Sequence, residues 1–223
     1  MKHSLNTLNA CVEKCRLCPR LVHYREEVPP KKAFEDEPHW RKPVPGFGDP
    51  KAWLLITGLA PSVQGGNRTG RLFTGDESAR FLFKALHDVG LANQPTSTSS
   101  HDGLRLHGCY MTAAVKCVPP QNKPTQAEFL RCHPYYENEI ALLPHLKAVL
   151  ALGKCAFDAY LSHVKAKGHT IRGMRFRHGE GYAFEGMPTL YTCYHPSPQN
   201  TNTGKLTNTM MKGVLKEIIK LST

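Results

Sequence analysis

The sequence predicts an α/β protein with three layers, in which a central, mostly parallel sheet of four strands is flanked by helices. A pattern of strand, loop and helix recurs four times along the 223 residues. Residues 145–153 (HLKAVLALG) are almost uninterrupted in their apolar character, as in a strand that is buried on both faces of a parallel sheet. No Ser/Gly-rich or charged linker divides the chain, so we expect a single domain over residues 1–223.

Hydrophobic periodicity places the individual elements. The expected strands lie at residues 51–57, 105–116, 145–153 and about 189–194, and the expected helices at 77–89, from about 125, at 154–164, and to about Lys220. The helix from Thr125 has a clear start, because Glu128 three residues later completes a capping box.

The long connection after the first strand, residues 58–76 (GLAPSVQGGNRTGRLFTGD), is the first candidate for a binding site. Loops at the carboxyl edge of a parallel sheet bind the ligands of α/β proteins, and the five glycines here let the backbone approach one closely. A flexible connection with chance polar residues is the alternative. The loop matches neither the dinucleotide fingerprint nor the P-loop, so no nucleotide cofactor is expected. Its functional side chains are Asn67, Arg68, Arg71, Phe73 and Asp76.

Two later loops carry further candidates. Asn122 follows the second strand and offers a donor and an acceptor together, which is what reading a base edge requires, although asparagine is equally common in simple turns. His195 follows the fourth strand directly, at the start of a turn that contains Ser197. A structural histidine is the alternative to a functional one at this position.

The charge of the chain suggests its partner. A formal net charge of +11 favours a polyanion, because each phosphate contact releases counterions. Residues 169–188 contain Arg172, Arg175 and Arg177, and their alternation and glycine turns predict a basic β-hairpin, either a solvated charged face or a phosphate contact. No apolar run is long enough to span a bilayer, and the N-terminus lacks the apolar core of a signal peptide. We therefore expect a soluble, cytoplasmic protein with no membrane partner.

Eight cysteines in such a chain indicate a metal site or buried thiols, because disulfides are rare inside the cell. Cys15 and Cys18 form a C-x-x-C pair, while Cys117 follows the second strand and Cys132 lies in or after the next helix. This set fits a four-thiolate site for an iron-sulfur cluster or for zinc. A thioredoxin-like pair would follow a strand, which is missing here, and ordinary buried thiols at Cys117 and Cys132 are the other alternative. The remaining cysteines are expected in the core at Cys109, Cys155 and Cys193, and as a spare thiol at Cys11.

Three stretches and the cysteine pattern together resemble one family, the iron-sulfur uracil-DNA glycosylases of family 5 (UDGb). The stretches are residues 58–76, 113–124 (AAVKCVPPQNKP) and 195–207 (HPSPQNTNTGKLT), with cysteines 15, 18, 117 and 132. Family 4 enzymes typically begin the first loop with G-E-x-P-G, whereas this chain has Leu59 in place of that glutamate and Asp76 after F-T-G. Both differences favour family 5, and the similarity extends from about Cys15 to the last helix.

The resemblance implies a monofunctional base excision repair enzyme. It would hydrolyse the N-glycosidic bond of uracil, and of deaminated bases such as hypoxanthine and xanthine, and leave an abasic site. A [4Fe–4S] cluster on Cys15, Cys18, Cys117 and Cys132 is implied, with damaged double- or single-stranded DNA as partner. We expect a monomer associated with the nucleoid.

The chemistry of base removal assigns roles to the candidate residues. The transition state resembles an oxocarbenium ion, so it needs negative charge near the sugar, from Asp76, and a donor toward the departing base, from His195. Backbone groups near Gly58 and Leu59 would fix the base or water, Phe73 would stack on the base, and Asn122 would read its edge. Residues 196–204 would fill the vacated stack. Contacts to DNA are expected from Arg68, Arg71, Arg172, Arg175, Arg177 and Ser197.

Two other classes of protein fit part of these observations. One is a non-catalytic, zinc-containing module that binds nucleic acid through its basic surface, for which Asp76 and the three loops would be superfluous. The other is a metal-dependent nuclease, although no aspartate-rich magnesium site is apparent in the sequence.

Overall fold

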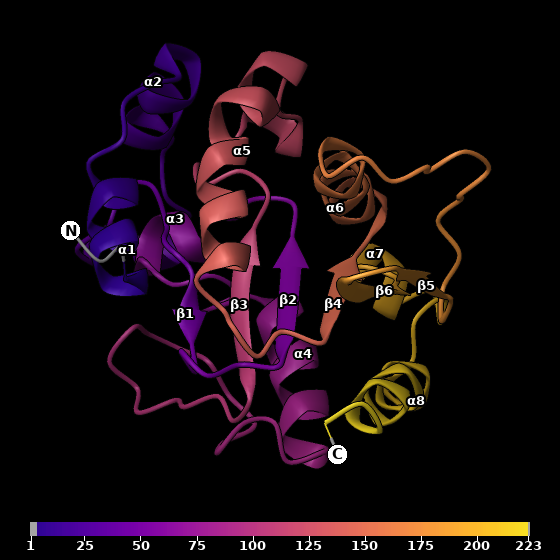
Figure 1. Ribbon diagram of the computed structural model, residues 1–223. Coiled ribbons are helices and arrows are strands. Elements are labelled where there is room, and N and C mark those ends of the chain that lie inside the picture. The colour runs from indigo at the N-terminus through magenta and orange to yellow at the C-terminus, as the bar shows by residue number, and fades with distance from the viewer. Residues whose placement is uncertain (1–3, 223) are drawn as a thin grey trace.

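The computed structural model describes residues 4–222 and contains one six-stranded sheet in the order β1-β3-β2-β4-β6-β5 (Figure 1). The four central strands β3, β2, β4 and β6 are parallel, and β1 and β5 pair antiparallel at the two edges. The strands are β1 (Phe47–Gly48), β2 (Leu54–Gly58), β3 (Cys109–Ala113), β4 (Ala148–Leu152), β5 (Gly181–Phe184) and β6 (Met187–Cys193). The predicted α/β class and its four parallel strands are confirmed, but the predicted strand count was wrong by the two edge strands.

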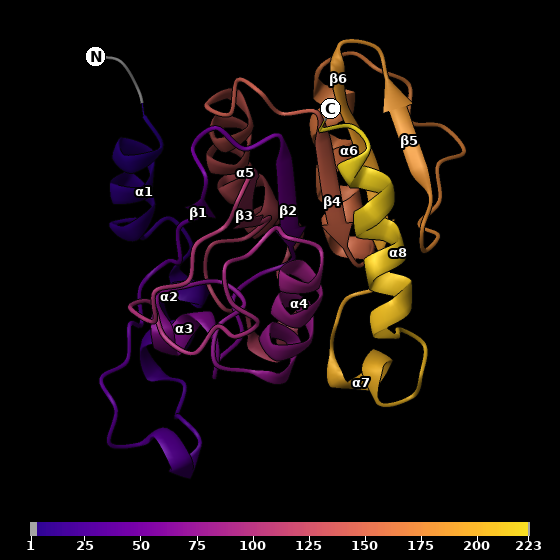
Figure 2. The same ribbon diagram turned by 90° about the horizontal axis from the view of Figure 1, so that it is seen from below.

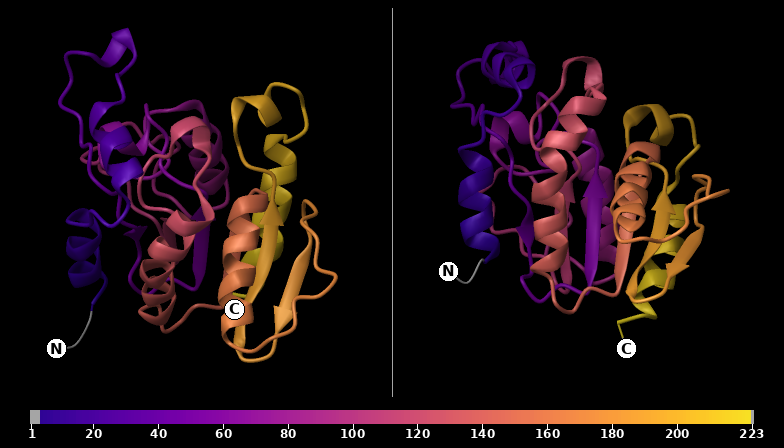
Figure 3. Two further views of the ribbon diagram at one scale, coloured as in Figure 1. Left: turned by 90° about the horizontal axis from the view of Figure 1, so that it is seen from above. Right: turned by 45° about the horizontal axis from the view of Figure 1, so that its top comes forward.

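Helices cover both faces of this sheet, as the three-layer prediction requires (Figures 2 and 3). The helices are α1 (Leu5–Glu13), α2 (Pro19–Glu27), α3 (Gly66–Thr69), α4 (Glu77–Asp88), α5 (Gln126–Ala141), α6 (Lys154–Ala166), α7 (Pro198–Thr201) and α8 (Asn208–Ile219), with 3-10 turns at Lys32–Phe34 and Pro120–Asn122. Helices α4 and α8 pack on one face, and α5 and α6 on the other. None of the helices within residues 4–222 is long and apolar enough to cross a membrane.

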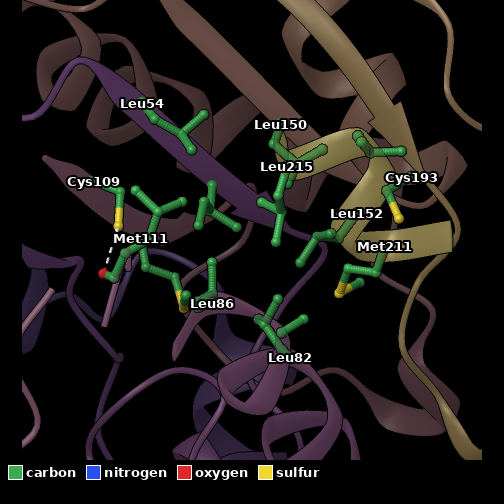
Figure 4. Close-up of a cluster of buried hydrophobic side chains, with 14 of the residues drawn as sticks. Leu54, Leu82, Leu86, Cys109, Met111, Leu150, Leu152, Cys193, Met211 and Leu215 are labelled. Carbon is green, nitrogen blue, oxygen red and sulfur yellow. Dashed lines mark hydrogen bonds between the residues drawn. The ribbon is translucent and has the colours of Figure 1, made fainter. Parts of the chain in front are cut away.

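The alternation of side chains along the central strands builds two cores. Leu54 and Leu150 point toward α4 and α8, where they meet Leu86 and Leu215 (Figure 4). Leu55 lies on the opposite face, in the core that α5 and α6 cover. Because both faces are covered, every residue of β2, β3 and β4 is buried, which explains why apolar residues dominate these strands.

A buried ion pair lies between the sheet and α5. The Lys116 side chain is 1% exposed and its Nζ lies 2.7 Å from Oε2 of Glu139, which is 0% exposed. Thr112 Oγ1 donates a hydrogen bond to the same carboxylate oxygen at 2.6 Å, whereas Glu139 Oε1 has no hydrogen-bond partner. The pair connects the end of β3 with α5, because Lys116 follows β3 and Glu139 belongs to α5.

The arginines expected on a β-hairpin lie outside it, which corrects that prediction. The hairpin consists of β5 and β6, whereas residues 169–180 are irregular and precede it. In this segment Ile171, Met174 and Phe176 pack against the core on the α6 side. Their spacing is not the strict period of two that a strand requires, so alternation with the arginines was a misleading signal.

Candidate active site

The glycine-rich loop between β2 and α4 is held in place by two buried arginines. Arg71 forms a two-pronged ion pair with Asp102, with Nη–Oδ distances of 3.0 and 2.7 Å, and also donates to Ser97 Oγ at 2.8 Å. Burial alone would raise the pKa of Asp102, but hydrogen bonds from Arg71 and from backbone N–H groups lower it well below its usual range. Asp102 is therefore ionised at neutral pH, and its ion pair with Arg71 holds the loop in place.

Arg68 fixes the first half of the same loop. Its Nη1 lies 2.5 Å from Glu37 Oε2, and its guanidinium lies 4.0 Å from the centroid of the Phe34 ring. Both arginines are at most 9% exposed. The predicted contact of Arg68 and Arg71 with DNA phosphates does not fit this placement, because both side chains are buried and paired with carboxylates. The two ion pairs fix the long loop instead, so it is not a flexible connection.

Phe73 occupies a strained position inside the loop. Its φ of +48° lies in the left-handed region, which costs a residue other than glycine about 1 kcal/mol or more. The ring packs over Gly58 at the end of β2, where an added Cβ would lie 3.0 Å from Phe73 Cζ. Its centroid is 6.0 Å from the ring of His195, so the structure brings together residues from the loops after β2 and β6.

Asp76 combines two structural contacts. It is the N-cap of α4, where Oδ1 accepts a hydrogen bond from the Ala79 N–H at 2.9 Å. Its Oδ2 accepts a hydrogen bond from Ser62 Oγ at 2.6 Å. A Cβ at Gly65 would lie 2.7 Å from Asp76 Oδ2, so glycine is needed for this close approach. The carboxylate is thereby fixed in direction while it remains half-buried. Ser62 was missed by the sequence analysis, since nothing in its spacing marks it.

His195 begins the loop that follows β6 and is half-buried. Burial lowers its pKa below the usual value, and the charge of Asp76 partly opposes this effect. The imidazole is therefore neutral near neutral pH and retains one N–H donor. Its backbone carbonyl accepts a hydrogen bond from Asn200 Nδ2 at 2.8 Å, which closes the turn over α7. Ser197, the N-cap of α7, lies half-buried in this turn.

Asn122 lies at the tip of the loop that follows β3. It and Gln121 both have positive φ, at +57° and +53°, so the chain makes a tight left-handed turn here. The Asn122 side chain is exposed and has no hydrogen bond within the described part of the chain. Directly after β3, the N–H groups of Ala114 and Val115 donate hydrogen bonds to the carbonyls of Gly58 and Leu59, at 3.0 and 2.9 Å. These bonds join the β2 and β3 loops.

The four predicted ligand cysteines line one small cavity between the N-terminal segment and α5. Arg25 Nη1 donates to Cys117 Sγ at 3.1 Å, and the Lys116 N–H donates to Cys132 Sγ at 3.2 Å. Burial raises the pKa of Cys117 to about 11 and that of Cys132 to about 12. Burial therefore favours the neutral thiols of Cys117 and Cys132, and only a bound cation would stabilise them as thiolates. Within the described residues, the cysteines that line the cavity are Cys15, Cys18, Cys117 and Cys132.

Comparison with known proteins shows the family to which the chain belongs. The family described as the uracil DNA glycosylase superfamily matches residues 45–219. A type-5 uracil-DNA glycosylase of Thermus thermophilus is 50% identical over 211 residues, which cover 93% of this chain and 94% of the relative. The chain belongs to the type-5 uracil-DNA glycosylase family. A further type-5 relative from Mycobacterium tuberculosis is 46% identical over 222 residues, which cover 98% of this chain and 82% of that protein.

Type-4 relatives are more distant, which confirms the resemblance to family 5 rather than family 4. A type-4 uracil-DNA glycosylase of Pyrobaculum aerophilum is 26% identical over 194 residues, covering 86% of this chain and 83% of the relative. The sequence differences at Leu59 and Asp76 therefore indicated the correct branch of the family.

The other cysteines test the remaining predictions for the thiols of this type-5 chain. Among the other cysteines, Cys109 and Cys193 are buried as predicted, whereas the prediction for Cys155 was wrong, because it is exposed in the first turn of α6.

Three exposed arginines lie on the segment beside the His195 loop. Arg172, Arg175 and Arg177 are exposed. The segment is tied to the sheet by His178, whose ring stacks on Tyr194 with centroids 4.9 Å apart and whose Nδ1 accepts a hydrogen bond from the Tyr194 N–H.

Lys205 adds a further cation to the same surface. Its Nζ lies 4.8 Å from the centroid of the Tyr194 ring, on the residue that precedes His195. The sequence analysis missed Lys205 as part of this surface, because its contact with Tyr194 depends on the fold.

Proposed function

We propose that this chain hydrolyses the N-glycosidic bond of uracil in DNA and leaves an abasic site. The observation that supports it most is the meeting of Asp76, Phe73 and His195 at the carboxyl edge of the parallel sheet, with the aromatic rings 6.0 Å apart. The type-5 uracil-DNA glycosylases to which the chain is related support the choice of substrate.

Asp76 supplies the negative charge that the transition state requires. Cleavage of the bond places positive charge on the sugar, and a carboxylate already oriented there stabilises it without reorganising. The hydrogen bonds from Ala79 N–H and Ser62 Oγ hold the carboxylate in one direction. The same group orients the water that attacks the sugar.

His195 stabilises the departing base. A neutral imidazole donates one hydrogen bond, and burial keeps this side chain neutral by lowering its pKa. Its N–H is directed to a carbonyl oxygen of the base, where negative charge develops as the bond breaks. The anionic Asp76 and the neutral His195 thus act on opposite halves of the same bond.

The base itself is held by four residues, from the end of β2 and from the loops after β2 and β3. Phe73 stacks on the extruded base, and backbone groups of Gly58 and Leu59 fix its position. The Asn122 amide reads the polar edge, because it combines donors and an acceptor and is free of other contacts in the described chain. An amide can present either group, so we extend the proposed substrates to hypoxanthine and xanthine.

DNA is held from the side of β6. Exposed arginines 172, 175 and 177 contact phosphates, and Ser197 with the turn that follows it enters the duplex where the base has left. The phosphate contacts do not need a second strand, so we propose that a monomer binds both double- and single-stranded DNA.

The four cysteines fit a [4Fe–4S] cluster. The chemistry of the donors and the two N–H···S hydrogen bonds support this group. When bound, it supplies four metal–thiolate bonds between the N-terminal segment and α5. Arg20 strengthens the same connection through a two-pronged ion pair with Glu128, with N–O distances of 2.8 and 2.6 Å. The group therefore acts as a structural cross-link between the N-terminal segment and the elements on either side of the Asn122 loop.

Base release in the presence of a chelator tests the function. Purified protein is incubated with duplexes that contain uracil, hypoxanthine or xanthine, and free base and alkali-labile sites are measured. We expect an abasic site in an intact strand. Strand cleavage that depends on added magnesium would support a nuclease instead, and binding without base release would support a non-catalytic module.

Metal content and colour test the cluster. Anaerobically purified protein should be brown and contain close to four irons per chain, and Cys117→Ser should lose most of the iron. The matched control is Cys155→Ser, which changes an exposed thiol remote from the cavity. A colourless protein with zinc bound by these four cysteines would refute the assignment.

A further inference from the structure

A second cluster of metal-binding side chains lies between α5 and α6. His133 and Glu137 are one helical turn apart on α5, and His163 faces them from α6. One donor atom of each lies within 4.8 Å of the others, the only such group of His, Cys, Asp or Glu within residues 4–222. The Glu137 Oε1 atom stands 3.7 Å from His133 Nε2 and 3.4 Å from His163 Nδ1.

Hydrogen bonding does not account for this arrangement. Neither contact to Glu137 has hydrogen-bond geometry, and His163 Nδ1 is buried without a hydrogen-bond partner. The His163 side chain is 4% exposed. A buried polar atom of this kind costs about 1–3 kcal/mol if nothing binds it, so it points to a ligand that completes the site.

The donor spacing matches one tetrahedral ion. Zinc bonds to imidazole nitrogen and carboxylate oxygen are about 2.0–2.2 Å long, which places neighbouring donors roughly 3.4 Å apart. The two separations of 3.4 and 3.7 Å agree with this value. We propose that His133, Glu137 and His163 form a zinc-type site for a divalent transition metal ion, separate from the cysteine site.

Two of the three proposed ligands reach the solvent, because the His133 side chain is 22% exposed and the Glu137 side chain 34%. A cavity of about 340 Å³ lies between α5 and α6 and is lined by His133 together with Asp158 and Ser162. A water molecule from this cavity completes a tetrahedron. The cysteine cavity shares no residue with it, because Cys132 and His133, although adjacent in sequence, project about 100° apart around α5.

The metal joins the two helices that cover one face of the sheet. Among the donors, the carboxylate compensates part of the metal charge and the two imidazoles bind as neutral ligands, a donor set typical of zinc. Helix α5 starts directly after the Asn122 loop, so fixing α5 to α6 also fixes the support of that loop. The site is thus a structural link rather than a second reaction centre.

The test uses the untagged, iron-loaded protein, freed of other metals by a chelator and titrated with zinc chloride in a calorimeter. We expect one zinc ion per chain with no loss of iron. At a zinc concentration about a hundred times the dissociation constant, the melting temperature should rise by roughly 5–10 °C. His133→Ala and Glu137→Gln each should weaken zinc binding at least about tenfold and abolish the shift.

His145→Ala is the matched control, because His145 is exposed and outside the cluster. It should bind zinc as the unchanged protein does. The folded state of each variant is checked by iron content and base release, and His133 is preferred to the more buried His163 for this reason. Absence of zinc binding, equal binding by the His133 and Glu137 variants, or release of iron in proportion to zinc would each overturn the proposal.

Discussion

Replacing Asp76 with asparagine separates the two roles of this side chain. As the N-cap of α4 it needs only an oxygen that accepts from the Ala79 N–H, now 2.9 Å away, and asparagine is as good an N-cap as aspartate. The new amide nitrogen can donate to Ser62 Oγ, so the 2.6 Å contact is reversed rather than lost. Only the negative charge disappears.

The expected effects on rate and on stability therefore differ in size. Loss of one preorganised electrostatic group costs about 2.7–4 kcal/mol in the transition state, or a factor of roughly 10²–10³ in rate. The free energy of unfolding should change by less than about 0.5 kcal/mol, since the cap is retained. Asp76→Ala loses the charge and the cap together, so it should also unfold about 2–4 °C earlier, for a cost near 1 kcal/mol.

Single-turnover base release with enzyme in excess measures the rate, and thermal unfolding of the same samples measures stability. Near-normal release by Asp76→Asn would remove Asp76 from the mechanism. Unfolding of Asp76→Asn as early as that of Asp76→Ala would instead show that the lost activity is structural. Borohydride treatment of the unchanged enzyme gives a further check, because a trapped protein–DNA adduct would replace water attack by amine chemistry.

Three other variants probe the rest of the molecule. Because folding lowers the pKa of His195, the unfolded chain binds more protons than the folded chain below about pH 6.5. The free energy of unfolding should therefore fall as the pH drops through that window. For His195→Gln it should fall less, as measured by denaturant titrations at about pH 7 and 5. Glutamines at residues 172, 175 and 177 should weaken binding to any DNA and lower the salt slope by about one unit per lost contact, and an unchanged slope would remove this segment from the interface. Lys116→Met leaves Glu139 buried and unpaired, which should cost about 3–5 kcal/mol in urea unfolding; a cost below about 1 kcal/mol would contradict this reading of the pair.

The central sheet could be predicted because its strands are buried on both faces. Strands β2, β3 and β4 are buried at every residue, so apolar residues dominate them and Thr57 and Thr112 are the polar exceptions. The edge strands carry no such signal. Strand β1 has two residues, and β5 has one buried residue among its four, so their pairing is decided by neighbouring strands rather than by their own composition.

The candidate site could be predicted by position more than by contact. Asp76 and His195 were selected because both belong to loops that follow parallel strands, where α/β folds bind their ligands, and Asp76 is the last residue before α4. The roles of Arg68 and Arg71 could not be found this way. Each pairs with a carboxylate 31 residues away in the chain, and the local sequence of a buried arginine does not differ from that of an exposed one.

The burial of these arginines also explains how a loop with two positive charges supports a reaction that needs negative charge. The Arg68 guanidinium lies next to Gly75, directly before Asp76, and an uncompensated cation there would weaken the field of the carboxylate at the sugar. Glu37 compensates Arg68, and Asp102 compensates Arg71. Arg172, Arg175 and Arg177, on the segment beside β6, are exposed and have no carboxylate partner within residues 4–222. In the proposed mechanism, the cations next to Asp76 are thus neutralised, whereas the cations that would meet phosphates are not.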